Sequence, residues 1–85
     1  MDTKSEKLRD ACEIAAQTLR KVDPENFLDI ILKLEYCIGS YNFDKNPKGL
    51  IEFGYQALGI LKEINKKQPR KVSKEVISDL EAGLS

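Results

Sequence analysis

The residues of this chain whose types could do chemistry are two cysteines, Cys12 and Cys37, and one acidic residue inside an apolar stretch, Glu35. A thiolate can act as a nucleophile, a redox partner or a metal ligand, usually together with a histidine or further cysteines. The chain contains no histidine, which removes the Ser-His and Cys-His pairs and the commonest zinc ligand. We therefore expect no catalytic activity, no metal site and no cofactor.

The two cysteines lie on either side of a predicted turn. Cys12 precedes Asp23 by 11 residues and Cys37 follows it by 14, so two antiparallel helices that meet there would bring the thiols to similar heights. We interpret both as buried thiols that act as small apolar side chains, with a redox pair or regulatory disulfide as the alternative. Two cysteines are too few for the disulfide framework of a small secreted domain, which favours a reducing, cytoplasmic location.

Glu35 falls at an angle close to Leu28, Ile31 and Leu32 in the helical periodicity. A carboxylate in such surroundings needs a partner or has a raised pKa. We expect it to emerge in a gap between helices or to pair with a lysine. The alternative is that it lines a functional cleft, although it has no second acid or oxyanion donor to work with.

Apolar residues that recur every three to four positions predict an all-α fold, a small helical bundle in one domain, residues 1–85. The stretch 3–6 fits a capping box at the start of the first helix, and Asp23-Pro24 fits the start of the second. A third helix carries apolar positions over 50–64, and Val72-Ser73 opens a shorter fourth. The prediction is three main helices and a short C-terminal one.

The second helix carries the widest apolar surface. From Phe27 to Tyr41 its apolar side chains spread over an arc of roughly 220°, which is more than one neighbouring helix can cover. We expect this helix to be the central element, touched by at least two others and hidden from water. Turn-forming residues over 39–49 predict a long loop after it.

Five of the six aromatic residues flank that predicted loop. They could form a satellite core that holds the loop down, or a recognition patch, since Tyr and Phe supply rigid contact area at low entropic cost. The candidate partner-binding residues at this end of the bundle are Tyr36, Tyr41, Phe43, Lys45, Lys48 and Tyr55.

Basic residues gather between the third and fourth helices, although the whole chain has 14 basic and 14 acidic residues and no net charge. With the N-terminus of the last helix they could bind phosphate backbones; the alternative is a solvated linker. The candidate anion or nucleic-acid contacts are Lys66, Lys67, Arg70, Lys71 and Lys74.

The charged N-terminus does not resemble a signal peptide, and no apolar run approaches the roughly 18 residues of a membrane span, so we expect no membrane partner. The sequence indicates a small cytoplasmic protein–protein interaction module without catalytic activity, with self-association as one form of binding. It would use the aromatic loop end or apolar surface left on the second helix. The alternative is an accessory nucleic-acid-binding protein that uses the basic segment, residues 66–74.

Overall fold

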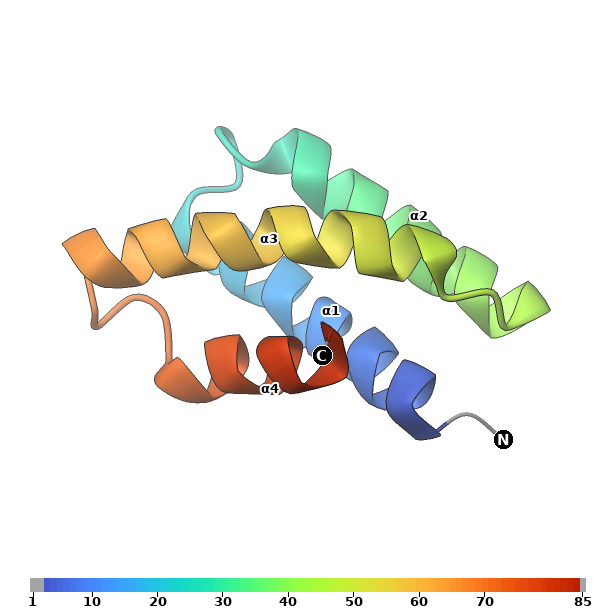
Figure 1. Cartoon of the computed structure of the whole chain (residues 1–85). Helices are drawn as coiled ribbons and strands as arrows, with labels where there is room; N and C mark the ends of the chain where they lie inside the picture. The colour runs from blue at the N-terminus through green and yellow to red at the C-terminus, as the bar shows by residue number, and fades with distance from the viewer. Residues whose placement is uncertain (1–2, 85) are drawn as a thin grey trace.

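The computed structural model describes residues 3–84 and contains four α-helices: α1 Thr3–Val22, α2 Leu28–Asp44, α3 Lys48–Lys67 and α4 Lys74–Leu84. No strand is present in these residues. Helices α2 and α3 form an antiparallel hairpin, and the chain then turns back so that α4 runs below α3 (Figure 1). The predicted all-α bundle of three long helices and a shorter last one is confirmed.

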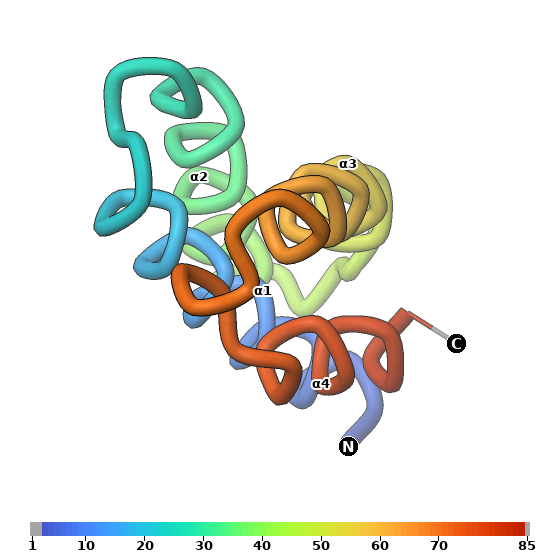
Figure 2. The backbone as a smooth tube through the Cα atoms, turned by 90° about the vertical axis from the view of Figure 1, so that its left-hand side faces the viewer, coloured from blue at the N-terminus to red at the C-terminus, as the bar shows by residue number. Residues whose placement is uncertain are grey.

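Helices α1 and α3 occupy the positions with the most neighbours. Within residues 3–84 each of them contacts the three other helices, whereas α2 contacts α1 and α3 but not α4. Figure 2 shows α2 and α4 on opposite sides of α1. The second helix therefore has two neighbours, as expected, but the prediction that it is the central helix and hidden from water is wrong: its outer face remains open.

Small side chains allow α1 to take three neighbours. Ala11, Ala15 and Ala16 are all buried on this helix, and short side chains let neighbouring backbones approach closely. Helix α4 also comes close to α1: a Cβ atom added at Gly83 would lie 2.9 Å from the Cα of Leu8. The sequence showed the small apolar stripe on this helix but not how many helices it would receive.

Helix α2 begins later than predicted. Residues 24–27 form a turn, and the helix starts at Leu28 instead of Pro24. The Asp23 carboxylate accepts hydrogen bonds from the backbone N–H of Asn26 at 3.2 Å and from its side-chain amide at 2.6 Å. The predicted capping residue therefore closes a turn just ahead of the helix.

The predicted long loop over 39–49 is wrong. Helix α2 continues to Asp44, and only residues 45–47 lie between α2 and α3. Tyr41, in the last turns of α2, is buried, and its carbonyl accepts the backbone N–H of Lys45 at 2.7 Å, where the chain leaves the helix with a φ of 61°. Packing of Tyr41 outweighs the low helix propensity of its neighbours.

The start of the last helix agrees with the sequence. The hydroxyl of Ser73 accepts the backbone N–H of Glu75 at 3.1 Å, as a capping residue does. Val72, directly before it, is buried in the core. The short connection from α3 is also held by Asn65, whose side-chain amide donates to the carbonyl of Val72 at 2.9 Å.

Candidate functional site

The outer face of α2 exposes a row of large apolar side chains. Leu28, Leu32, Tyr36 and Phe43 follow one another at intervals of four, four and seven residues, so they lie within an arc of about 80°. Their exposed fractions rise along the helix, from 46% and 52% at the two leucines to 78% at Tyr36 and 92% at Phe43. Gly39 lies on the same arc, and a Cβ added there would meet nothing within 4 Å. We call these five residues the α2 stripe.

The charges beside the α2 stripe are paired within the chain. Lys33 lies 3.1 Å from Asp29 one turn earlier on the same helix. Glu35 accepts two hydrogen bonds from the guanidinium of Arg20 on α1, at 2.7 and 3.1 Å. The charged groups on α2 next to Leu32 and Tyr36 are therefore neutralised in pairs.

Glu35 is paired with a basic residue, as expected, but the residue is Arg20 and not a lysine. Hydrogen bonds from Arg20 lower the pKa of the Glu35 carboxyl, and the same bonds raise the pKa of the Arg20 guanidinium. The raised pKa considered from the sequence is therefore wrong, because nearly half of this side chain is exposed and its partner is cationic. The pair links α1 to α2 at their surface.

The structure separates the aromatic residues that the sequence grouped together. Tyr41 is buried, with Lys45 Nζ 5.5 Å and Arg9 Cζ 6.0 Å from the centre of its ring. It anchors the end of α2 and offers almost no surface to a partner, so its place among the predicted contact residues is wrong. Lys45 lies over that ring, and Lys48 is exposed at the first position of α3.

Tyr55 lies on α3 and belongs to a different surface. Its hydroxyl donates a hydrogen bond to the carbonyl oxygen of Leu84 at the end of α4, at 3.2 Å. It lines a groove to which no residue of the α2 stripe contributes. Of the predicted aromatic contact residues, only Tyr36 and Phe43 therefore share one exposed face.

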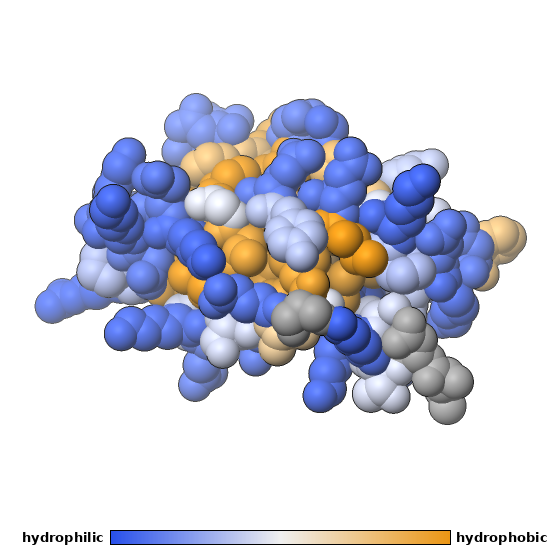
Figure 3. Space-filling view, in the orientation of Figure 1, coloured by the Kyte–Doolittle hydropathy of each residue, from blue (hydrophilic) through white to orange (hydrophobic). Residues whose placement is uncertain are grey.

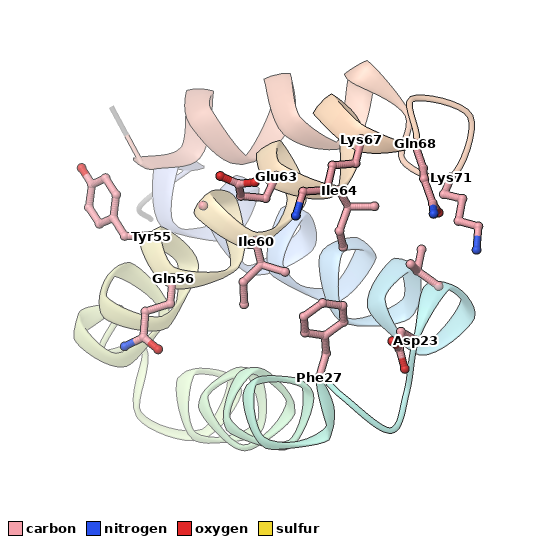
Figure 4. A pocket seen from close by; sticks show the side chains of 12 residues that line it. Asp23, Phe27, Tyr55, Gln56, Ile60, Glu63, Ile64, Lys67, Gln68 and Lys71 are labelled. Atoms are coloured by element: carbon pink, nitrogen blue, oxygen red, sulfur yellow. The ribbon is translucent and has the colours of Figure 1, made fainter.

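The groove beside α3 has a volume of about 730 Å³ and was not found from the sequence (Figure 4). Its apolar floor comes from α3, the end of α1 and the turn before α2, and Gly59 leaves open space in it. The position of the groove depends on the distances between these elements, and the apolar periodicity of the sequence gives no information about those distances. The lining residues are Val22, Asp23, Phe27, Tyr55, Gln56, Gly59, Ile60, Glu63, Ile64, Lys67, Gln68 and Lys71.

Apolar surface is also visible from the side of α3 and α4. In Figure 3, hydrophobic residues show over the middle of this face, and hydrophilic side chains project around them. Long charged side chains often cover apolar surface in this way, with the charged end in water. The face is therefore more mixed in character than the α2 stripe, where apolar side chains themselves project.

The predicted basic segment lies around the connection between α3 and α4. Two of its lysines line the groove, together with the acidic residues Asp23 and Glu63. At the start of α4 the Ser73 hydroxyl already accepts one free N–H group, and Glu75 adds a negative charge to the first turn. These features reduce the attraction of this region for anions. All five predicted contacts are exposed: Lys66, Lys67, Arg70, Lys71 and Lys74.

Both cysteines are free, buried thiols, which confirms their interpretation as apolar side chains. Burial, with a smaller effect from Cys37, raises the pKa of the Cys12 thiol to about 12. Burial and the nearby Glu52 carboxylate also raise the pKa of Cys37. Thiols with raised pKa values are poor nucleophiles at neutral pH. The Cys12 sulfur lies 3.9 Å from the carbonyl oxygen of Leu50, to which it can donate.

Two further observations concern residues 3–84 alone. None of the four helices in this range combines the length and apolar character needed to cross a bilayer. No three His, Cys, Asp or Glu side chains in this range are grouped so that they could hold a metal ion.

Comparisons with known proteins found no matching family model, curated protein or solved structure. Within residues 3–84 the fold is a small four-helix all-α bundle, and the function has to be inferred from its surfaces.

Proposed function

We propose that this chain is a small protein–protein interaction module, without a catalytic step, that binds its partner through the α2 stripe. The observation that carries the proposal is the exposure of Tyr36 and Phe43 on one face of a regular helix. A fully buried aromatic side chain hides 150–250 Å², so these two residues together expose roughly 250–400 Å² of surface. Contiguous apolar patches of this size on a small protein commonly mark binding sites.

The stripe also has the geometry of a helix-packing surface. Its apolar side chains recur at helical intervals, as they do on helices that dock against a partner helix or into a groove. The opposite face of α2 is held by the buried residues Ile31 and Leu34. Because the helix is already fixed in the bundle, little backbone ordering would be needed on binding, which favours affinity.

A cytoplasmic location is part of the proposal. The two free, buried thiols of the structure are typical of proteins kept in a reducing compartment. The alternative function, nucleic-acid binding through residues 66–74, gains no support from the acidic groups near that segment. A titration with generic DNA and RNA tests it, because binding that falls steeply with added salt would favour the alternative over the α2 stripe.

The proposal is tested by capture of partners from the cells that produce the protein, with three baits. The first is the wild-type chain, the second carries Tyr36→Ser and Phe43→Ser, and the third is a control with Gly59→Lys in the α3 groove. We expect proteins that are retained by the first and third baits and lost from the second. If all three baits retain the same proteins, the α2 stripe is not the binding surface.

A further inference from the structure

We propose that the partner of the α2 stripe is a second copy of this chain, packed antiparallel so that Leu32 of each copy fits over Gly39 of the other. This inference rests on the proposed function and adds to it the identity and orientation of the partner. It follows from the order of large and small side chains along the stripe, from the surface available and from the charges at the border.

The order of residues along the stripe is self-complementary. In an antiparallel pair of helices, residues that face each other have numbers with a constant sum, and a sum of 71 suits this stripe. Leu32 then faces Gly39, where the missing side chain leaves open space for it. Leu28 faces Phe43 in the same register, so an aliphatic side chain meets the most exposed aromatic one.

The middle of the same arrangement is polar enough to fix the register. Tyr36 of one copy faces Glu35 of the second copy across the two-fold axis. The phenol is a hydrogen-bond donor, and the Glu35 carboxylate is held in its charged form by Arg20. A shift of the register by one residue would place Leu32 against Ser40 or Ile38 and remove the match with Gly39.

The exposed surface supplies a large share of the area that a dimer needs. Interfaces of standard size bury about 800 Å² on each partner. Tyr36 and Phe43 supply roughly 250–400 Å² of this, and Leu28 and Leu32 add to it. Helix α2 has 17 residues, so it is about 25 Å long and offers contacts along its whole length.

The charges near the stripe do not oppose a symmetric contact. Two identical surfaces repel each other when they carry unpaired charges of one sign. Here Asp29 is paired with Lys33 at 3.1 Å, and Glu35 with Arg20 at 2.7 Å. Each copy therefore brings neutralised charges beside the middle of the stripe, which is compatible with a self-complementary interface.

The first experiment measures self-association by analytical ultracentrifugation over a range of concentrations. We expect a monomer–dimer equilibrium whose dissociation constant rises about tenfold or more with Phe43→Ser, which removes the most exposed aromatic side chain of the stripe from both ends of the interface. Gly39→Lys should weaken the dimer similarly, because it fills the space for Leu32. Gly59→Lys is the matched control: it adds the same side chain at an exposed glycine of α3 and should leave the dissociation constant unchanged.

The second experiment tests the orientation by cross-linking. A chain with Leu28→Cys is mixed with a chain with Phe43→Cys under mild oxidation, and the wild-type chain controls for the buried thiols Cys12 and Cys37. The antiparallel pairing predicts a disulfide in the mixture and little in either variant alone. Efficient disulfide formation by the Phe43→Cys chain alone would indicate parallel helices and would overturn the register.

The outcomes separate this inference from the proposed function. A chain that remains monomeric at all concentrations refutes the second copy, while the capture experiment still decides whether the α2 stripe binds another protein. A dimer that is insensitive to Phe43→Ser and Gly39→Lys refutes the use of the stripe for self-association. Loss of dimer with both variants, together with the mixed disulfide, supports the inference.

Discussion

Substitution of single glycines by alanine tests the packing of α4 on α1. At Gly83 the new Cβ would lie 2.9 Å from the Cα and 3.2 Å from the N of Leu8. Backbone atoms cannot rotate away as a flexible side chain does, so the end of α4 would have to move outward. Forcing an extra group into a packed region costs about 1–3 kcal/mol, against which alanine gains up to about 1 kcal/mol in helix propensity.

The expected result is a free energy of unfolding lower by about 1–2 kcal/mol for Gly83→Ala. In a domain of this size 1 kcal/mol corresponds to about 4–8 °C in Tm, so thermal unfolding followed by circular dichroism resolves it. Gly39→Ala and Gly59→Ala are matched controls, because a Cβ at either position meets nothing within 4 Å. Both should be as stable as the wild type or up to about 1 kcal/mol more stable.

The measurement is made at concentrations where the chain is monomeric, so that association does not add to the apparent stability. A Gly83→Ala variant as stable as Gly39→Ala would refute the close contact between α4 and Leu8. The position of α1 between α2 and α4 would then have to be abandoned as well.

Three further predictions concern the buried and exposed side chains of the bundle. The pKa of the Cys12 thiol is raised to about 12, so the stability that the buried neutral thiol contributes is fully present below about pH 9 and should be lost as the pH rises towards 12. Urea titrations of the wild type and of Cys12→Ala at several pH values measure this loss. If the free energies of unfolding of the two chains change with pH in parallel, the prediction is contradicted. The pKa of Glu35 is lowered by Arg20, so the small stabilisation from this exposed pair should be present above about pH 4.5 and lost as the pH falls through the folded pKa. Glu35→Gln should lose that acid-dependent part of the stability curve, and an unchanged curve would show that the pair contributes nothing. Tyr41→Ala should lower the free energy of unfolding by about 3–5 kcal/mol, as for other buried aromatic residues, whereas Phe43→Ala should stay within about 0.5 kcal/mol of the wild type. If chemical denaturation shows that Tyr41→Ala and Phe43→Ala lower the free energy of unfolding equally, one of these two side chains is wrongly placed in the structure.

The local features of the helices followed from the sequence. The apolar periodicity predicted four helices, and the Val72-Ser73 signal predicted the start of the last one, because helix type and capping depend on residues a few positions apart. The buried thiols of Cys12 and Cys37 were also predicted, since both fall on apolar faces. The sequence did not predict where α2 ends, because the packing of Tyr41 outweighed the helix-breaking tendency of the turn-forming residues around it.

The candidate site was only partly visible in the sequence. Tyr36 and Phe43 were predicted as contact residues and are the two most exposed large apolar side chains in the described range. Tyr41 was grouped with them because all three lie near one another along the chain. Their separation depends on a rotation about the helix axis: Tyr41 faces the body of the bundle, and Phe43, two residues later, faces away from it.

The amino-acid sequence by itself determined which residues form helices and which face of each helix is apolar, because both properties depend on neighbours within one or two turns. Only the tertiary structure decided which apolar faces are covered. Within residues 3–84, α2 packs against α1 and α3 but not α4, so only part of its apolar arc is covered. Which faces are covered depends on close packing between segments that are far apart in the chain. In this structure the packing leaves the α2 stripe exposed to water.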